Sequence, residues 1–304
     1  MKVAVTGSSG LIGTALVASL RSDDHQVIRL VRRPPRSDNE VRWDPRAPDA
    51  GLATAQDALE GIDACVHLAG AGVGSRRWTA RYKTEIRDSR VLGTRALASA
   101  LTRLGLPPAT LVAASAIGWY GETGGREVDE SVPAGKTFLA RLVHDWEAAA
   151  DPAAEAGIRV VHPRSGLVLT PAGGLLARLL PLARLGVCPR FGSGRQAMSW
   201  ISLSDEIGAI RFLLNRQDIS GAVNLIAPEP ATNSAFTAAL NLAAGRRDRP
   251  WLRVPAPLLR LGLGEASAEL LTSTRVVPKR LTAAGYPFRH PALPEALAAE
   301  LATR

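Results

Sequence analysis

Hydrophobic positions in the first half of the chain follow two periods in turn, one typical of strands and one typical of helices. The strand-like segments, short apolar runs rich in β-branched residues, are Lys2–Thr6, Gln26–Val31, Val41–Trp43, Ala64–Leu68, Thr110–Ala116 and Arg159–Leu169. The segments with helical spacing are Leu11–Arg21, Ala80–Leu104 and Thr137–Ala156. Because strands that alternate with helices form parallel sheets, we predict an α/β fold, a Rossmann-type doubly wound parallel sheet.

Beyond Thr170 the pattern becomes less regular. Pro171 is expected to open a helix, and Cys188–Arg195 is expected to form a loop. Ser204, which two acidic residues follow, is expected to begin another helix, because acidic side chains favour a helix N-terminus. The apolar run Val223–Ala227 predicts one more strand of the sheet.

The C-terminal segment differs in composition from the rest of the chain. From Pro250 onward it is rich in Leu and Ala and is interrupted by prolines, which predicts a short helical appendage. We therefore expect a Rossmann domain over residues 1–247, with substrate-side elements from about residue 165. A small helical C-terminal domain is expected over residues 248–304.

The composition is that of a globular protein, with 46% hydrophobic and 21% charged residues among 304. The first residues already form a predicted core strand, which leaves no room for a cleavable signal. The most apolar stretch, Leu175–Val187, contains Arg178, Pro181 and Arg184, so it is too short and too charged to span a bilayer. We expect a cytoplasmic protein with no membrane partner.

The net charge of +9 raises the question of a nucleic-acid partner. Only four of the 37 basic residues are lysines, and the arginines are scattered in runs no longer than a pair. No nucleic-acid partner is therefore expected, although the positive balance suits an anionic dinucleotide. The five histidines and two cysteines lack the spacing of a metal site, so no metal is expected either. Cys65, in an apolar run, is expected to be buried.

A glycine-rich turn with the spacing GxxGxxG follows the first strand and opens the first helix. Gly7 permits a tight turn, Gly10 lets the backbone approach a pyrophosphate, and Gly13 lets the helix pack closely on the sheet. The helix N-terminus offers free N–H groups to phosphate. Three glycines alone are weak support, but their place between strand and helix predicts a dinucleotide site. Its contacts are expected from Thr6, Gly7, Ser9, Gly10, Leu11, Ile12 and Gly13.

The end of the second strand indicates which dinucleotide binds. An NAD enzyme usually has Asp or Glu there to bind the ribose 2′-hydroxyl. Here the strand runs into Arg32 and Arg33, and no acidic residue follows until Asp38. Because guanidinium groups bind phosphate, the pair predicts NADP(H). The alternative is that arginines end this strand only because arginine is abundant in the chain.

Two polar segments are expected at the carboxyl edge of the sheet. Leu68, Ala69 and Gly70 follow the fourth strand and are expected to line the cofactor. Ser115 and Tyr120 follow the fifth strand, at the edge that faces the nicotinamide in this fold class, and are the candidate catalytic residues. The alternative is a strand-end turn with a packed aromatic ring.

The GxxGxxG spacing resembles that of short-chain dehydrogenases, whose usual catalytic device, a Tyr-x-x-x-Lys pair, is missing here. Four residues after the three tyrosines stand Ile86, Gly124 and His290, and the helix that should carry the pair has Phe138 and Leu142. A tyrosine without such a lysine has a pKa near 10, too high for proton transfer at neutral pH. Either another group carries the proton, or catalysis has been lost.

Together, the motifs resemble the atypical, epimerase-like short-chain dehydrogenases of the NAD-dependent epimerase/dehydratase superfamily that carry a C-terminal domain of unknown function. The resemblance covers nearly the whole chain. Its motifs are TGSSGLIG (6–13), HLAGAGV (67–73), SAIGWYG (115–121), FLARLVHDWE (138–147), RSGLVLTPAGG (164–174), GSGRQAMSWIS (192–202), NLIAPEPATN (224–233), LGEASAELL (263–271) and RVVPKRLTAAGYPF (275–288).

The resemblance implies residue roles as well as a fold. The glycine turn and Arg32 would hold the pyrophosphate and the 2′-phosphate, and Leu68 and Ala69 would line the cofactor. Glu85 and Arg90, on the long helix, would contact it from the other side. For these two residues, salt bridges on a charged helix surface are the alternative.

Two functions stay open. The first is an NADP(H)-dependent oxidoreductase or epimerase for a small polar, nucleotide-linked substrate, with Tyr120 or a water carrying the proton. The second is a non-catalytic NADP(H)-sensing protein that contacts a partner through its C-terminal domain. Extended members of the superfamily often dimerise through their long helices, which makes a homodimer an expectation. The substrate and the direction of the reaction do not follow from the sequence.

Overall fold

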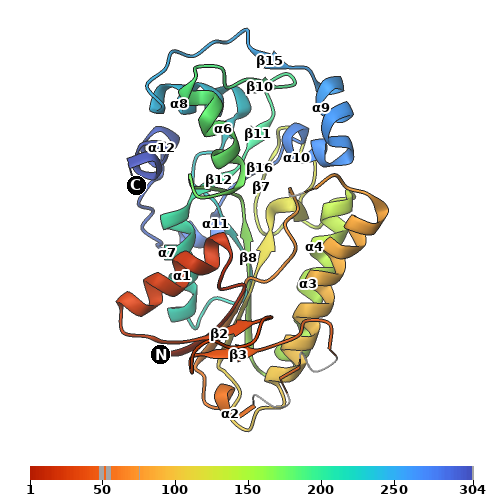
Figure 1. Ribbon diagram of the computed structural model, residues 1–304, viewed down its shortest axis with the longest axis vertical. Helices are drawn as coiled ribbons and strands as arrows, with labels where there is room; N and C mark the ends of the chain where they lie inside the picture. The colour runs from red at the N-terminus through yellow and green to blue at the C-terminus, as the bar shows by residue number, and fades with distance from the viewer. Residues whose placement is uncertain (48–50, 53–55, 75, 303–304) are drawn as a thin grey trace.

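Parallel strands form the central sheet of the computed structural model, which describes residues 1–47, 51–52, 56–74 and 76–302 (Figure 1). The sheet order is β13 (Gly221–Leu225), β8 (Arg159–Ser165), β5 (Thr110–Ala113), β4 (Ala64–His67), β1 (Lys2–Thr6), β2 (Gln26–Val31) and β3 (Glu40–Arg42), with β6 (Ser115–Ala116) also paired to β8. The chain builds outward from β1 to β3 and then returns to place β4 on the other side of β1. This order reversal is the switch point at which Rossmann folds bind ligands, and it confirms the predicted fold class.

Helices cover both faces of the sheet because side chains alternate along each strand. Val3 and Val5 point to the face covered by α1 (Leu11–Ser22), α7 (Leu203–Asn215) and α11 (Lys279–Ala283). Ala4 and Cys65 point to the opposite face, where α2 (Gln56–Leu59), α3 (Ala80–Leu101) and α5 (Asp151–Glu155) pack. Cys65 is buried, as predicted. The helix α4 (Phe138–Ala148) lies beside α3 (Figure 1).

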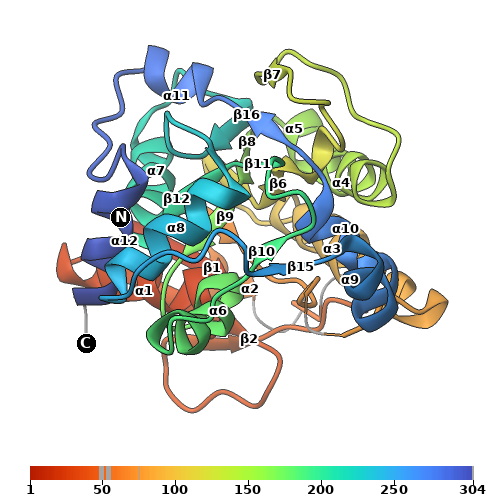
Figure 2. The same ribbon diagram turned by 90° about the horizontal axis from the view of Figure 1, so that it is seen from above.

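A second group of short elements lies above the carboxyl ends of the strands, around a core that includes Trp200 and Phe236 (Figure 2). Its helices are α6 (Gly174–Arg184), α8 (Asn233–Ala243) and α12 (Leu293–Ala302). Its strand pairs are β9 (Leu167–Leu169) with β12 (Trp200–Ser202), β10 (Arg190–Phe191) with β15 (Arg253–Val254), and β11 (Ala197–Met198) with β14 (Ala231–Thr232).

The C-terminal segment is helical, with α9 (Ala256–Leu263), η2 (Gly264–Ser267) and α10 (Ala268–Leu271), but it is woven into the rest of the chain. Its β15 pairs with β10, and its β16 (Arg275–Val276) pairs with β7 (Glu127–Val128). The domain boundary expected at residue 247 stays a prediction, and residues 303–304 lie outside the described residues.

Several expected elements differ in their bounds. The long helix ends at Leu101, not at Leu104, and the expected helix over 137–156 is two helices, α4 and α5. Pro152 lies in the first turn of α5, the place where a helix tolerates the missing N–H of proline. The expected strand over 159–169 is divided at Gly166, where a Cβ atom would lie 2.6 Å from the Ser199 carbonyl oxygen.

The helix α7 begins at Leu203, one residue before the expected start at Ser204. Ser202 is the N-cap, and its Oγ accepts a hydrogen bond of 3.1 Å from the Asp205 backbone N–H. The expected loop over 188–195 contains the short strand β10. Across the described residues, every helix is too short or too polar to span a bilayer.

Candidate functional site

The glycine turn between β1 and α1 has the geometry that its spacing predicts. Gly7 has φ +63°, and a Cβ atom there would lie 2.7 Å from the Leu68 carbonyl oxygen. A Cβ atom on Gly13 would overlap the Gly7 carbonyl oxygen. The turn is closed by a hydrogen bond of 2.8 Å from the Gly10 N–H to the Gly7 carbonyl. Glycine is therefore required at positions 7 and 13 by the path of the backbone.

The first turn of α1 is open to a ligand. Gly10 is the N-cap and forms no side-chain capping bond, so the N–H groups of Leu11, Ile12 and Gly13 lack an intrahelical acceptor. Ser9 and Gly10 are exposed, and the first turn carries no acidic side chain. Free N–H groups at a positive helix end suit a phosphate group.

The two arginines after β2 differ in their surroundings. Arg32 is exposed, and within the described residues no ion pair engages it. Arg33 instead donates from Nη1 and Nη2 to the two carboxylate oxygens of Glu40, at 2.7 and 2.6 Å. The expected pair of free guanidinium groups is therefore reduced to one, because Arg33 already binds an internal anion.

Glu40 also binds Arg29, whose Nη1 lies 3.1 Å from the same carboxylate. The Nε of Arg29 donates to Ser8 Oγ at 3.1 Å, which ties this cluster to the glycine turn. We name Arg29, Arg33 and Glu40 the arginine clamp. The clamp was not predicted, because the third strand was expected to begin at Val41, whereas Glu40 is in β3 and pairs with Arg29 in register.

Thr6 and the loop after β4 are held together beneath the glycine turn. Thr6 Oγ1 lies 2.7 Å from His67 Nδ1 and accepts a hydrogen bond of 3.1 Å from the Leu68 N–H. Burial lowers the pKa of His67 to about 4, which keeps the ring neutral. Thr6 itself is fully buried, so it positions Leu68 and Ala69 and does not face a ligand directly.

Arg90 reaches from α3 to this loop. Its Nη1 donates to the Ala71 carbonyl at 2.8 Å, and its guanidinium carbon lies 3.2 Å from the position of a Cβ atom on Gly70. The group is also 5.0 Å from the Trp146 ring centroid, and burial lowers its pKa to about 10. Glu85 is exposed on α3, and within the described ranges no ion pair involves it. Arg90 thus lies against the loop after β4, whereas Glu85 is exposed but lacks the surface salt bridge that the alternative expects among the described residues.

Ser115 belongs to a buried polar network. Its Oγ donates to Glu147 Oε1 at 2.5 Å, and Arg164 binds both oxygens of Glu147 at 2.8 and 2.9 Å. The side chains of Arg164 and Glu147 are only 3% and 11% exposed. Arg164 also lies 3.8 Å from the Trp119 ring centroid, so the turn after β6 covers it.

Tyr120 completes the network. Its hydroxyl donates to Asn224 Oδ1 at 2.7 Å and accepts from Arg164 Nη1 at 3.1 Å, while burial raises its pKa. A hydroxyl with both partners satisfied in the interior is not available to a substrate. The geometry therefore does not support the expected proton-carrying role of Tyr120, and it gives Ser115 and Tyr120 a structural role. Glu147, Arg164 and Asn224 were missed because they come from three separate segments.

The positions where a Tyr–Lys pair would lie are apolar in the structure. Phe138 packs edge-on against Trp78, with ring centroids 5.4 Å apart, and Leu142 is buried in the same cluster with Tyr82. The Tyr82 hydroxyl donates to the Gly72 carbonyl at 2.5 Å. No proton-transfer pair of the usual kind is present among the described residues near this edge.

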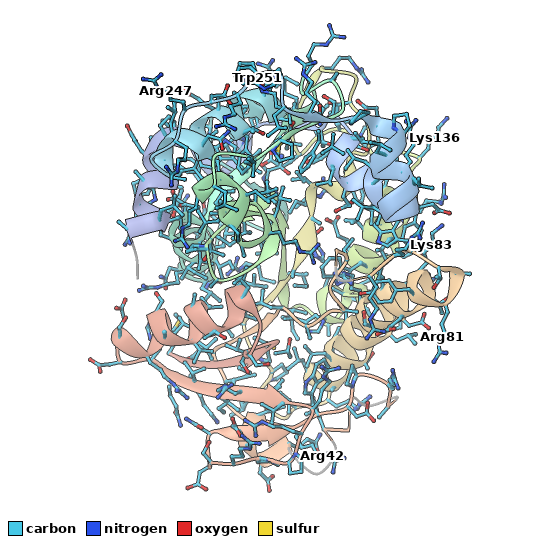
Figure 3. All side chains as sticks on the ribbon, turned by 45° about the horizontal axis from the view of Figure 1, so that its top comes forward. Arg42, Arg81, Lys83, Lys136, Arg247 and Trp251 are labelled. Carbon is cyan, nitrogen blue, oxygen red and sulfur yellow. The ribbon has the colours of Figure 1, made fainter. Side chains whose placement is uncertain are left out.

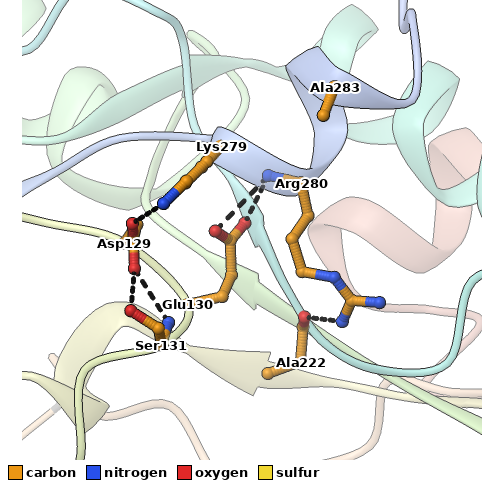
Figure 4. Close-up of a pocket in the computed structure, with 7 residues that line it drawn as sticks. All are labelled: Asp129, Glu130, Ser131, Ala222, Lys279, Arg280 and Ala283. Carbon is orange, nitrogen blue, oxygen red and sulfur yellow. Dashed lines mark hydrogen bonds and ion pairs between the residues drawn. The ribbon is translucent and has the colours of Figure 1, made fainter.

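A hollow of about 430 Å³ lies at the free edge of β13, away from the glycine turn (Figure 4). Its polar groups are already paired: Lys279 with Asp129 at 2.7 Å, and Glu130 with the Asn224 N–H at 3.0 Å. Arg280 donates to the Ala222 carbonyl at 2.5 Å. These side chains cover the backbone groups of an edge strand, which is a structural role.

Basic side chains are spread around the molecule (Figure 3). Arg42 lies at one end, Arg81 and Lys83 lie on α3, and Arg247 lies at the opposite end with Trp251, which is 76% exposed. Among the described residues, no group of His, Cys, Asp and Glu has an arrangement that could hold a metal ion.

Comparisons with known proteins found two matching family models, similar sequences and a similar crystal structure. The sequence model of the NAD dependent epimerase/dehydratase family matches residues 3–225, and that of a domain of unknown function, DUF1731, matches residues 254–300. Epimerase family protein Mb2239 of Mycobacterium bovis is 46% identical over 296 residues, which cover 97% of this chain and 96% of that protein. Human epimerase family protein SDR39U1 is 34% identical, with 98% of each chain covered. The crystal structure of human SDR39U1 (isoform 2) with NADPH superposes with a TM-score of 0.90 over 100% of both chains, at 33% identity.

Proposed function

Because the chain belongs to the NAD dependent epimerase/dehydratase family, we propose that it binds NADP(H) over the carboxyl ends of β1 and β4 and acts on a small polar substrate there. The observation that carries the proposal is the open first turn of α1 beside the exposed Arg32. The human relative was crystallised with NADPH, which supports the phosphorylated dinucleotide.

The residues present fit such a cofactor. The glycine turn and the N–H groups of Leu11, Ile12 and Gly13 would hold the pyrophosphate, because a Cβ atom is absent where the backbone must come close. Arg32 would bind the 2′-phosphate. Leu68 and Ala69 would line the adenosine side, and Arg90 would hold the loop that follows them.

The bound nicotinamide would supply hydride exchange with a carbon of the substrate. The side chains expected to move the proton are committed elsewhere, since Ser115 donates to Glu147 and Tyr120 donates to Asn224. A water or a substrate group therefore carries the proton in this proposal. A nucleotide sugar is the substrate class of this proposal, supported by a structure 34% identical in sequence that is named a nucleoside-diphosphate sugar epimerase of Corynebacterium glutamicum.

The experiment is a thermal-shift screen of the protein with NADP⁺ against nucleotide sugars, sugars and aldehydes, followed by absorbance assays of the stabilising compounds at the nicotinamide band. We expect turnover that survives in Tyr120→Phe, provided that the variant is assayed below its melting temperature. Turnover that disappears in a folded Tyr120→Phe would restore Tyr120 as the proton carrier.

A second candidate is a non-catalytic NADP(H) sensor that contacts a partner through the C-terminal segment. The apolar packing of Phe138 and Leu142, at the positions where short-chain dehydrogenases usually carry a Tyr–Lys pair, favours it. Tight NADPH binding with no turnover across the whole screen would select this function. The cytoplasmic location, the homodimer and the absence of a nucleic-acid partner stay predictions.

A further inference from the structure

The arginine clamp places an anion on Arg33, one of the two arginines expected to bind the 2′-phosphate. We propose that Glu40 competes with the 2′-phosphate of NADP(H) for Arg33 and so limits how strongly the site prefers NADP(H) to NAD(H). This inference rests on the function proposed above and adds a residue that determines cofactor specificity. Glu40 acts through Arg33, so it does not itself contact the dinucleotide.

Arg33 already uses most of its hydrogen-bond donors within the protein. A guanidinium group has five N–H donors. Arg33 uses one from each terminal nitrogen for Glu40, at 2.7 and 2.6 Å, and another from Nη1 for the Pro34 carbonyl at 2.9 Å. The Nη1–Nη2 edge, one of the two edges through which a guanidinium group can bind a phosphate in bidentate fashion, is therefore occupied by a carboxylate of the same charge sign.

The competing carboxylate is fixed in place. Its side chain is 3% exposed, and it also accepts from Arg29 Nη1 at 3.1 Å and from the Arg36 backbone N–H at 2.8 Å. The hydrogen bonds from Arg33 and Arg36 lower the pKa of Glu40 to about 2, so the group is ionised throughout the physiological pH range. A 2′-phosphate must displace this anion or bind Arg33 through its remaining donors.

The arginine clamp contacts the glycine turn that is expected to bind the nucleotide. Arg29 donates to Ser8 Oγ of the glycine turn at 3.1 Å, and Arg32 directly precedes Arg33 at the end of β2. Arg32 is free to bind the 2′-phosphate, whereas Arg33 must exchange one anion for another. NAD(H) lacks this phosphate, so its affinity should not depend on the exchange.

The test compares the wild-type protein with Glu40→Gln by fluorescence titration with NADPH and NADH. Glutamine keeps the size of the side chain and removes its charge. We expect NADPH to bind about tenfold more tightly to the variant, because a charge-assisted contact to Arg33 becomes available, while NADH affinity stays unchanged.

Two further variants make the result specific. Asp38→Asn removes the same charge from the same loop, and within the described residues no hydrogen bond joins Asp38 to Arg33, so NADPH affinity should change little. The double variant Arg33→Ala/Glu40→Gln should lose the gain, because the released guanidinium is gone. If thermal melts show that Glu40→Gln is poorly folded, Glu40→Ala replaces it in the same titrations.

The titrations of these variants either support the competition between Glu40 and the 2′-phosphate or overturn it. An equal gain in Asp38→Asn would show a general charge effect and overturn it. Weaker NADPH binding in the Glu40 variants would mean that Glu40 positions Arg33 for the phosphate, which also overturns it. NADPH binding by the wild type without a gain in Glu40→Gln rejects this inference alone, whereas no binding of NADPH by any of the proteins rejects the proposed cofactor as well.

Discussion

The buried pair of Glu147 and Arg164 should be essential to the stability of the fold. We consider Glu147→Gln, which removes the charge and leaves Arg164, 3% exposed, without its anion. The loss of one partner from a buried ion pair typically costs about 3–5 kcal/mol, because the remaining charge stays desolvated. The bond from Ser115 to Glu147 is weakened as well, so a value within this range is expected.

The assay is urea denaturation followed by circular dichroism. With a denaturant slope of about 3 kcal/mol/M for a chain of this size, the midpoint should fall by about 1 M or more. The double variant Glu147→Gln/Arg164→Met should lower the urea midpoint less than Glu147→Gln alone, because it leaves no buried charge unpaired.

The matched control is Asp218→Asn, which breaks an exposed pair with Arg216. Its urea midpoint should stay nearly unchanged, since exposed ion pairs contribute little. A Glu147→Gln midpoint within the error of this control would refute the structural role of the network and would reopen Ser115 as a catalytic residue.

The Tyr120 hydroxyl, the glycine turn and the buried Glu206 can each be tested by a single substitution. Tyr120→Phe should lower the free energy of unfolding by about 1–2 kcal/mol, because Asn224 and Arg164 each lose a hydrogen-bond partner. NADPH affinity should stay unchanged, and a loss of affinity in a folded variant would contradict this prediction. Gly13→Ala should abolish NADPH binding, because its Cβ atom would overlap the Gly7 carbonyl. The control Gly262→Ala, which has open space around it, should bind NADPH normally and gain about 0.5–1 kcal/mol of stability. Normal NADPH binding by Gly13→Ala would refute the requirement for glycine at position 13. Burial raises the pKa of Glu206 from 4.5 to about 7, so the folded state holds its proton while the unfolded state releases it, and stability falls as the pH rises from 4.5 to 7. Glu206→Gln should remove this loss of about 3 kcal/mol, so the stability difference between the variant and the wild type should grow from pH 4.5 to pH 7. A difference that stays constant over this range would count against the buried acid.

The sheet and its glycine turn could be predicted from the sequence because their signals are local. Apolar runs such as Gln26–Val31 and Ala64–Leu68 report burial on both faces, and the glycines report a backbone path within a few residues. The start of α7 was less well predicted, because Ser202 and Ser204 are both residues that favour an N-cap and only Ser202 caps the helix.

The polar networks could not be predicted because they join segments that are distant in sequence. Ser115 and Glu147 are 32 residues apart, and Tyr120 and Asn224 are 104 apart. The Arg29–Glu40 contact of the arginine clamp could have been predicted from the strand pairing, because the two residues are neighbours across β2 and β3. A one-residue error in the start of β3 concealed it.

The most direct test of the account is calorimetric titration of NADPH and NADH into the wild-type protein and Arg32→Ala. Because Arg32 is exposed beside the open turn of α1, the wild type should prefer NADPH. Arg32→Ala should weaken NADPH binding by about tenfold or more and leave NADH binding nearly unchanged. A wild type that binds NADH at least as tightly as NADPH, or an equal loss for both in the variant, would contradict the proposed cofactor site.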